Sequence, residues 1–348
     1  MQEVMNNSVG EWLRGGPEND VVISSRVRLA RNVEGCRFLP KADEQEIARI
    51  ETMLSSKILS CKLRPGLVYY RLDELEPLFR QLLVERHLMG RDHAEADWRR
   101  GLAFCPQERL CLLVNEEDHL RVQVVYGGFQ LERAWRELNE VDDVLAGVIP
   151  YAFSPDYGYL TACPTNVGTG MRASVMVHLP ALVMAREMDK VVDLAQRLHL
   201  ALRGLYGEGT HASADLYQVS NQVTIGVTEE EIIEQLTAAS GEIMSLERGA
   251  REEFFVHNRA KLKERIDRAL SMLASATTIS SEEALHLLSQ VRLGVEMKLV
   301  TDVSLETLNE LLLLTLPAHL QTILGGKVEV LKRDEVRADC VRKKLGLN

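Results

Sequence analysis

Residues 163–174 read CPTNVGTGMRAS, and this stretch decides how the rest of the sequence is interpreted. Proline, glycine and threonine punctuate its first half, a composition typical of a loop. From Arg172 the chain continues as RASVMVHLP, in which apolar residues alternate with others as they do in a strand. The pattern predicts a loop that offers backbone N–H groups beside Arg172, with Cys163 close by, followed by a strand.

The same stretch can be tested against two nucleotide-binding fingerprints. Gly168, Gly170 and Ala173 match the GxGxxA spacing, and Asp189 lies at about the right distance beyond them for a dinucleotide site. That site requires a helix after the glycines, whereas this chain continues as a strand that carries Pro180. A Walker loop does not fit either, because no Lys-Ser or Lys-Thr pair follows a glycine loop.

Upstream, residues 24–31 read SSRVRLAR. On a strand, Arg26 and Arg28 project from one face, while Val27 and Leu29 project from the other. Two adjacent guanidinium groups suit phosphate oxygens, because arginine forms paired hydrogen bonds to oxyanions and keeps its charge. A solvated strand face with ordinary ion pairs explains the pattern equally well.

Residues 111–126 read CLLVNEEDHLRVQVVY, two apolar runs around a polar turn. This pattern predicts a β-hairpin and therefore antiparallel pairing. The turn at residues 115–118 is followed by His119 and Arg121. Carboxylates at a strand end can hold a metal, act as a general base or clamp a cationic substrate. A polar turn without such a role is the more ordinary explanation.

A glycine-rich stretch, LRGLYGEG, occupies residues 202–209. Glycines flank Glu208, so the sequence predicts a mobile loop that carries one carboxylate, with Arg203 just before it. Most glycine-rich turns are only turns, and this stretch alone indicates no function.

The composition is that of a globular protein with room for about two domains. The 348 residues are 46% hydrophobic and 26% charged, and the net charge of −10 argues against attraction to nucleic acid or anionic membranes. The N-terminal residues do not resemble a secretory signal, and no apolar run approaches the roughly 18 residues that span a bilayer. Six cysteines without metal-ligand spacing argue against zinc and disulfides and favour the cytoplasm.

Helical and strand patterns divide the chain into two parts. Asp43 and Glu46 form a capping-box pattern, and Ser280 with Glu283 forms a second. From Thr228 onward strand signals nearly vanish and helices follow one another. The fold class expected is α+β, with an all-α C-terminal part. The elements expected in the first part, besides those above, are helices over residues 43–59, 75–87 and 182–196, a strand over residues 198–203 and a strand or pair of strands over residues 216–227.

Together, four stretches resemble one family. SSRVRLARN, NEEDHLR, CPTNVGTGMRAS and RGLYGEG occur in the order and approximate spacing of the phosphagen (guanidino) kinase catalytic domain, which the chain resembles over residues 21–246. The resemblance implies an antiparallel sheet flanked by helices, an ATP site and phosphoryl transfer to a guanidinium nitrogen. Because a guanidinium holds its protons at neutral pH, its nitrogen needs a base before it can attack. The resemblance assigns that task to Glu117 and Glu208, and makes Cys163 the reactive cysteine beside the cationic substrate.

The same resemblance implies how the nucleotide is bound. Arginines neutralise the triphosphate while charge moves to the leaving oxygen, and Mg²⁺ is held mainly by phosphates and water, with no protein residues as metal ligands. His87 matches a family position near the nucleotide, although a histidine that completes the apolar face of a helix fits the sequence too. The residues expected at the ATP site are Ser24, Ser25, Arg26, Val27, Arg28, His87, Arg121, Arg172, Ala173, Ser174, Val175, Met176, Arg203, Gly204, Leu205, Tyr206 and Gly207.

The chain departs from the small-molecule members of the family in two respects. It begins almost at SSRVRLARN, without their helical N-terminal domain, and Tyr206 stands where they usually have arginine. Instead it has a helical C-terminal part that ends in KRDEVRADCVRKK. This combination resembles the bacterial branch that phosphorylates arginine side chains of proteins and so marks them for an ATP-dependent protease, a role in protein quality control and stress response. The expected domains are a catalytic part over residues 1–248 and a helical part over residues 249–348.

In that branch an RDxxRA element forms a regulatory pocket for phosphoarginine, here Arg333, Asp334, Arg337 and Ala338. On a helix, Arg333 and Arg337 are neighbours that can hold one phosphate, with Asp334 available for a guanidinium. Without the resemblance, a solvated basic helix end explains the element. Apolar helix faces suggest a homodimer. The partners implied are proteins with exposed arginine, an activator protein and an AAA+ unfoldase–protease.

Three other functions can be weighed against this one. One is a kinase of free arginine or another small guanidino compound, and a second is a silent adaptor that reads phosphoarginine. Both carboxylates and all five matched arginines are present, which argues against a silent adaptor. A DNA-binding regulator that uses residues 24–31 is disfavoured by the acidic net charge.

Overall fold

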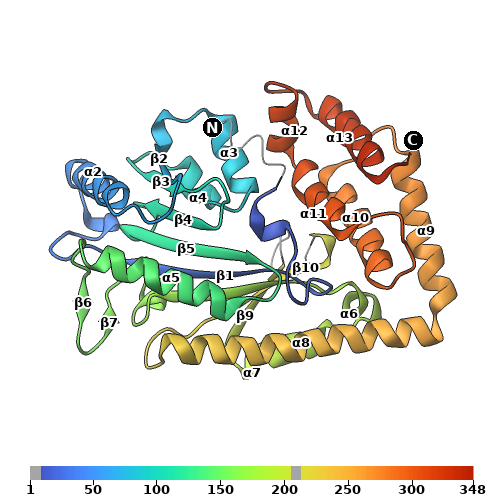
Figure 1. Ribbon diagram of the computed structural model, residues 1–348, viewed down its shortest axis with the longest axis horizontal. Helices are drawn as coiled ribbons and strands as arrows, with labels where there is room; N and C mark the ends of the chain where they lie inside the picture. The colour runs from blue at the N-terminus through green and yellow to red at the C-terminus, as the bar shows by residue number, and fades with distance from the viewer. Residues whose placement is uncertain (1–8, 205–212, 348) are drawn as a thin grey trace.

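An antiparallel sheet forms the centre of the computed structural model, which describes residues 9–204 and 213–347 (Figure 1). The sheet has eight strands in the order β2-β3-β4-β5-β1-β8-β10-β9. Its strands are β1 (Val22–Arg31), β2 (Val68–Arg71), β3 (Gly101–Phe104), β4 (Leu110–Val114), β5 (Leu120–Gly127), β8 (Met171–His178), β9 (Leu200–Gly204) and β10 (Leu216–Asn221), and β6 (Phe153–Ser154) pairs with β7 (Gly158–Tyr159) in a separate hairpin.

Helices cover the sheet on both faces, which confirms the α+β fold with a helical C-terminal part. Helices α2, α5, α7 and α8 pack on one face and share its hydrophobic core. The helices are α2 (Glu44–Ser60), α3 (Pro77–Glu85), α4 (Arg91–Glu95), α5 (Leu131–Ala146), α6 (Pro180–Ala185), α7 (Met188–Arg197), α8 (Glu229–His257), α9 (Arg259–Ser275), α10 (Ser281–Glu296), α11 (Leu305–Leu314), α12 (Pro317–Ile323) and α13 (Val330–Leu345), with short 3-10 turns such as η1 (Glu11–Leu13) and η5 (Ser213–Asp215) between them.

Residue alternation explains why the sheet has one apolar and one polar face. On β1, Val27 and Leu29 are fully buried in the core, and Arg26 and Arg28, which alternate with them, lie half-buried on the opposite face. The predicted hairpin is confirmed, because β4 pairs antiparallel with β5. The polar face is therefore built from the alternate residues of neighbouring strands.

The helix expected over residues 182–196 is wrong as a single element. It is divided into α6 and α7 at Arg186, whose φ of 61° is left-handed, and the N–H of Arg186 caps α6. Both halves turn apolar residues to the same core, so the apolar spacing continues across the break. Where a strand or pair of strands is expected over residues 216–227, the structure forms one strand that ends at Asn221, whose side chain hydrogen-bonds three backbone groups and turns the chain out of the sheet.

The C-terminal helices pack on the second face of the sheet. Helix α8 runs along the first face and leads into α9, and α10 and α11 then return over the second (Figure 1). Leu216 of β10 shares an apolar cluster there with Leu285 and Leu313. Residue 248, the expected domain boundary, lies within α8, and the division into two domains stays a prediction. Among the described residues, no helix is long and apolar enough to cross a membrane.

Candidate active site

Four of the five predicted arginines lie on neighbouring strands of the polar face, and the fifth follows on β9. Arg28 of β1 lies directly opposite Arg172 of β8, and Arg121 of β5 lies opposite Ala30. Arg203 lies opposite Gln218 on β10, which pairs with β8. The strand order thus brings together residues that are far apart in the sequence.

The electrostatics show that these guanidinium groups face one another. Burial, and then the charges of Arg121 and Arg172, lower the pKa of Arg26 to about 10. Burial and the same neighbours also lower the pKa of Arg28, an effect that Glu116 opposes. The buried Nε of Arg28 has no hydrogen-bond partner among the described residues. Like charges gathered around an unused donor form a site that favours an anion with several oxygens.

The hairpin turn at residues 115–118 divides into two structural and two site residues. The buried Asn115, with φ of 57°, donates through Nδ2 to the carbonyls of Ile47 and Arg99 at 3.0 Å each. The buried Asp118 accepts from Asn32 Nδ2 and Ala162 N at 2.6 Å each. These two residues hold the turn in place.

The two glutamates of the turn point toward the arginines. Glu116 forms an ion pair with Arg121 at 2.6 Å. Glu117 is more exposed, lies 3.3 Å from Arg121 Nη2 and accepts a hydrogen bond from Asn166 Nδ2 at 3.4 Å. Glu117 therefore stands at the open edge of the arginine cluster, where a carboxylate can reach a cationic ligand.

The loop that contains Cys163 lies beside this edge. Cys163 Sγ is 3.0 Å from Thr165 Oγ1. Burial and the charge of Arg203 lower the pKa of Arg172, while Cys163 and Glu117 oppose this lowering, so these side chains are electrostatic neighbours. The structure thus brings Cys163, Glu117 and the arginines into one region.

Two glycines of the loop are required by close backbone approaches. Gly168 has φ of +109°, and a Cβ there would lie 2.1 Å from Thr224 O. Gly170 has φ of +64°, and a Cβ would lie 2.6 Å from Ala30 O. These contacts, rather than a dinucleotide fingerprint, explain the glycine spacing.

A cavity continues from the arginines toward η1. Trp12, Ser24, Arg26, His87, Ser174 and Met176 are among its lining residues. The His87 ring meets Trp12 edge to face, with 5.3 Å between centroids. Burial, Arg26 and His319 lower the pKa of His87 to about 4, so its imidazole is neutral at neutral pH. A second hollow, lined by Arg28, Glu116 and Arg121, shares Arg26 and His87 with the first.

The other residues predicted at the ATP site have different surroundings. Ser25 is buried, and its hydroxyl donates to Gly128 O at 2.8 Å. The side chains of Val27, Ala173 and Val175 lie in the hydrophobic core. Only the backbone of these residues can therefore contribute to the ATP site. Gly204 ends β9. Four predicted residues lie outside the described residues: Leu205, Tyr206, Gly207 and Glu208.

Three lining residues were not singled out from the sequence. Glu116 was seen only as part of an acidic turn. Gln123 lies two residues after Arg121 on β5, and strand alternation could have placed it on the same face. Its Nε2 donates to His87 O at 3.3 Å. Trp12 comes from the N-terminal segment, where no pattern indicated a role.

The RDxxRA element lies on α13, and its arginines differ in exposure. Arg337 is 2% exposed, and donates from Nε to Thr315 O at 2.6 Å and from Nη1 to Ile279 O at 2.7 Å. It also pairs with Asp334, and Ala338 is buried beside it. Arg333 instead lines a groove between α3, α4 and α13.

Comparison with known sequences gives two profile matches. Residues 49–250 match the ATP:guanido phosphotransferase, C-terminal catalytic domain, and residues 259–348 match the Protein-arginine kinase McsB C-terminal domain. Relatives named protein-arginine kinase include one from Halothermothrix orenii, 40% identical over 100% of this chain and 99% of its own length. Another, from Pelotomaculum thermopropionicum, is 42% identical over 99% of this chain and 98% of its own length.

Solved structures give the same fold. A taurocyamine kinase from Schistosoma mansoni, bound to transition-state analogue components, has a TM-score of 0.61 and 28% identity, over 67% of this chain and 34% of that one. A lombricine kinase has a TM-score of 0.58 and 26% identity, over 69% of this chain and 71% of that one. The chain therefore belongs to the ATP:guanido phosphotransferase family and, within it, to the protein-arginine kinases.

Proposed function

We propose that the protein transfers the γ-phosphoryl group of ATP to arginine side chains of other proteins. The observation that carries the proposal is the arginine cluster: Arg26, Arg28, Arg121 and Arg172 face one another, with Glu117 at their open edge. Such a cluster suits a triphosphate, and a carboxylate beside it suits a guanidinium. Family membership supports both assignments.

ATP would bind with its phosphates on the cluster and its base toward the cavity lined by Trp12, His87 and Met176. The arginines would offset the charge that builds on the leaving oxygen during transfer. Within residues 9–204 and 213–347, no group of three or more His, Cys, Asp or Glu side chains is placed to hold a metal ion. We propose that Mg²⁺ enters with ATP, coordinated by phosphate oxygens and water, and adds further neutralisation there.

The substrate guanidinium would lie between Glu117 and Cys163, with the second family carboxylate, Glu208, as the other clamp. A guanidinium nitrogen attacks the γ-phosphorus, and the bond from that phosphorus to the β–γ bridging oxygen breaks. ADP leaves with the bond's electron pair, and a carboxylate takes the proton lost by the nitrogen. The sulfur of Cys163 would lie beside the cationic substrate.

The protein substrate is supported by the C-terminal match and by the names of relatives that this chain matches over nearly its whole length. We further propose a cytoplasmic location, a homodimer, an activator protein and delivery of the phosphorylated proteins to an AAA+ unfoldase–protease. The RDxxRA element would be a phosphoarginine sensor, and Arg333 is its best placed arginine, because it lines a groove with Arg80 and Arg91.

Incubation with Mg-ATP and an unrelated arginine-rich protein tests the function. Products are mapped by mass spectrometry at neutral pH, because the N–P bond is acid-labile. The proposal expects phosphate on protein arginines. Phosphate on free arginine alone would establish a small-molecule kinase instead. The assay is repeated with cell extract as a source of activator. A protein that binds phosphoarginine but transfers no phosphate under either condition would be a non-catalytic adaptor.

The sensor is tested with Arg333→Ala, because the buried Arg337 cannot be removed without leaving two carbonyls unpaired. The variant should phosphorylate protein at the wild-type rate and lose its response to added phosphoarginine. Lys332→Ala, an exposed neighbour on the same helix, is the control. An unchanged response in Arg333→Ala would contradict the assignment.

A further inference from the structure

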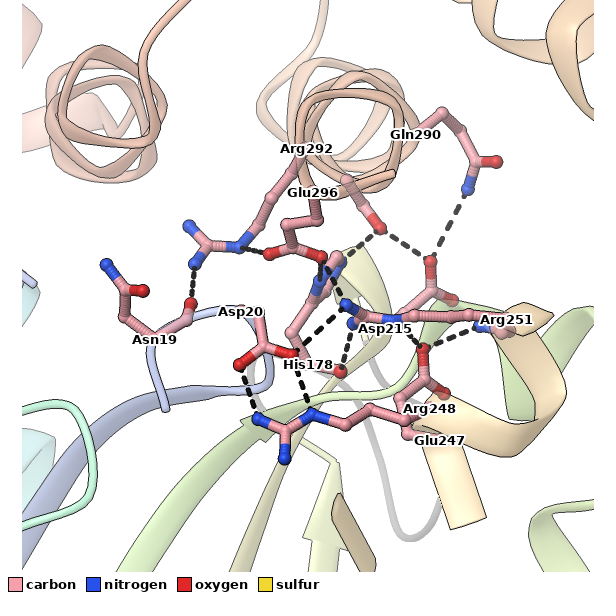
Figure 2. A network of polar contacts seen from close by, with 12 residues as sticks. Asn19, Asp20, His178, Asp215, Glu247, Arg248, Arg251, Gln290, Arg292 and Glu296 are labelled. Carbon is pink, nitrogen blue, oxygen red and sulfur yellow. Dashed lines mark hydrogen bonds and ion pairs between the residues drawn. The ribbon is translucent and has the colours of Figure 1, made fainter. Parts of the chain in front are cut away.

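A network of buried polar side chains joins the end of β8 and the start of β10 to α10 (Figure 2). The hydroxyl of Ser289 on α10 donates to Asp215 Oδ2 at 2.6 Å and lies 2.9 Å from His178 Nε2. Gln290 Nε2 adds a longer contact to Asp215 Oδ2 at 3.5 Å. His178 closes β8, and Asp215 stands directly before β10. A single helix residue thus ties together the ends of two adjacent strands.

The backbone at this point is one that rarely forms unless its surroundings hold it. Ala214 and Asp215 have φ of 61° and 53°, two consecutive left-handed residues, neither of them glycine. The Asp215 carbonyl accepts from Leu179 N at 2.9 Å, and Ala214 is buried in a cluster with Leu285 of α10. The Ser289 contact is the side-chain part of this support.

Helix α10 is itself held firmly against the sheet. Glu296 forms ion pairs with Arg251 at 2.9 Å and Arg292 at 2.8 Å, and the side chains of all three are buried. Arg292 Nη2 donates to Asn19 O at 2.8 Å (Figure 2). Each of the two arginines has a carboxylate at ion-pairing distance, and Arg251 has a second one in Glu247 at 2.7 Å, which is the condition under which buried ions are tolerated. Ser289 therefore projects from a fixed support.

From Asp215 the chain enters β10, which positions part of the candidate active site. Gln218 lies opposite Arg203, and Ser220 Oγ is 3.3 Å from Arg172 Nη2. Asn221 Oδ1 accepts from Ala173 N at 2.9 Å. Arg26, Arg28 and Arg121 lie on β1 and β5, which do not pair with β10. A shift at the start of β10 would move Arg172 and Arg203 and leave the other three in place.

Serine, histidine and aspartate are also the residues of a hydrolytic triad, but the arrangement differs. In a triad the histidine lies between serine and the acid, whereas here Ser289 lies between His178 and Asp215 and is 3% exposed. The Ser289 hydroxyl donates its proton to Asp215 and is buried, so it is not placed to attack a substrate.

We propose that Ser289 is a positioning residue for phosphoryl transfer. From the helical part of the chain it fixes Asp215, and through β10 it keeps Arg172 and Arg203 at the positions that the transition state requires. The helical part therefore contributes to catalysis within the same chain. This inference rests on the proposed function.

Ser289→Ala in the full chain tests the proposal, with Ser240→Ala as the matched control. Ser240 is a buried serine on α8 whose hydroxyl has no hydrogen-bond partner among the described residues, so its loss removes only a hydroxyl. The rate of protein phosphorylation, the KM for ATP, the Kd of MgADP and the melting temperature are measured for each. Kinetics are recorded well below the unfolding transition.

We expect kcat of Ser289→Ala to fall by about tenfold relative to Ser240→Ala, because misplacement of catalytic groups by roughly 1 Å can cost up to ~10²-fold. The KM for ATP and the Kd of MgADP should stay within about twofold, since the loss is confined to the transition state. Asp215→Asn should lower kcat similarly, and the double variant should be no slower than the slower single one.

Three results would overturn the positioning role. They are a kcat equal to that of Ser240→Ala, a fall in activity that matches the unfolded fraction, and equal losses in MgADP binding and kcat. Wild-type protein that transfers no phosphate to protein arginine would instead contradict the proposed function. The experiments therefore distinguish a failure of the positioning role from a failure of the proposed function.

Discussion

Arg251 and Arg292, between α8 and α10, have carboxylates at ion-pairing distance, whereas Arg26 and Arg28 on β1 are surrounded mainly by other arginines. Arg251 and Arg292 are buried, and Arg26 and Arg28 are half-buried. In the first, Glu296 pairs with both arginines and Glu247 pairs with Arg251, and the result is a support for the fold. In the second, neither arginine forms an ion pair among the described residues, and the Nε of Arg28 has neither an ion pair nor a hydrogen bond there.

The difference separates residues that maintain the structure from residues that await a ligand. Buried like charges raise the free energy of the folded state, and an anion that binds among them relieves that cost. Where the buried charges are already paired, a ligand does not stabilise the folded state further. Removal of one partner destabilises the folded state strongly, because it leaves a buried charge unpaired. Substitutions in the arginine cluster should therefore change activity and nucleotide binding, whereas substitutions around Arg251 and Arg292 should change stability.

The largest effect is expected at the open edge of the arginine cluster. Glu117→Gln removes the carboxylate that takes the proton, so the transfer rate should fall by roughly 10²- to 10⁴-fold. Its melting temperature should match the wild type, because 46% of the side-chain surface is exposed. Glu140→Gln, at another exposed glutamate on α5, should change neither quantity. Turnover retained by Glu117→Gln would refute the base assignment.

In the paired network of Arg251, Arg292, Glu247 and Glu296, a substitution should change stability instead of activity. Glu296→Gln leaves the buried Arg292 without its anion and leaves Arg251 only Glu247, which should cost about 3–5 kcal/mol in the free energy of unfolding. Glu187→Gln, which breaks the exposed pair with Lys190, should cost about 1 kcal/mol or less. Urea unfolding measures both. Equal costs for the two variants would show that the buried network is not the support described here.

A smaller effect concerns pH. Burial, Arg26 and His319 lower the folded-state pKa of His87 to about 4, below the usual value of 6.5. The unfolded chain therefore takes up this proton first, so stability present above pH 6.5 is lost as the pH falls toward 4. The loss is on the order of 1.4 kcal/mol per pH unit. In His87→Gln, the free energy of unfolding should depend less steeply on pH between 6.5 and 4 than in the wild type. Equal slopes in the variant and the wild type would contradict the assignment.

Local pattern predicted the polar face correctly, because alternation on a strand is a local property. It placed Arg26 and Arg28 on one face of β1 and located the hairpin that carries Glu117. It did not show that Arg31, the third arginine of the same stretch, is buried in an ion pair with Asp142 at 2.8 Å. Partners far apart in the chain decide that difference.

The same limit applies to the turn and to the C-terminal element. Nothing in the letters NEED separates the structural Asn115 and Asp118 from the glutamates, because their partners come from other segments. Arg333 and Arg337 have the helical spacing expected, yet the carbonyls of Thr315 and Ile279 hold only Arg337 inward. The network around Ser289 had no sequence signal, since it joins separate elements.

Thermal unfolding of Arg28→Met and Arg292→Met, with and without MgATP, tests the central contrast most directly. Methionine keeps much of the apolar stem of arginine and removes its charge. Arg28→Met should melt at or above the wild-type temperature without nucleotide and lose the rise that MgATP produces. Arg292→Met should melt well below the wild type and keep that rise. An Arg28→Met variant as destabilised as Arg292→Met, with the MgATP rise intact, would contradict the account.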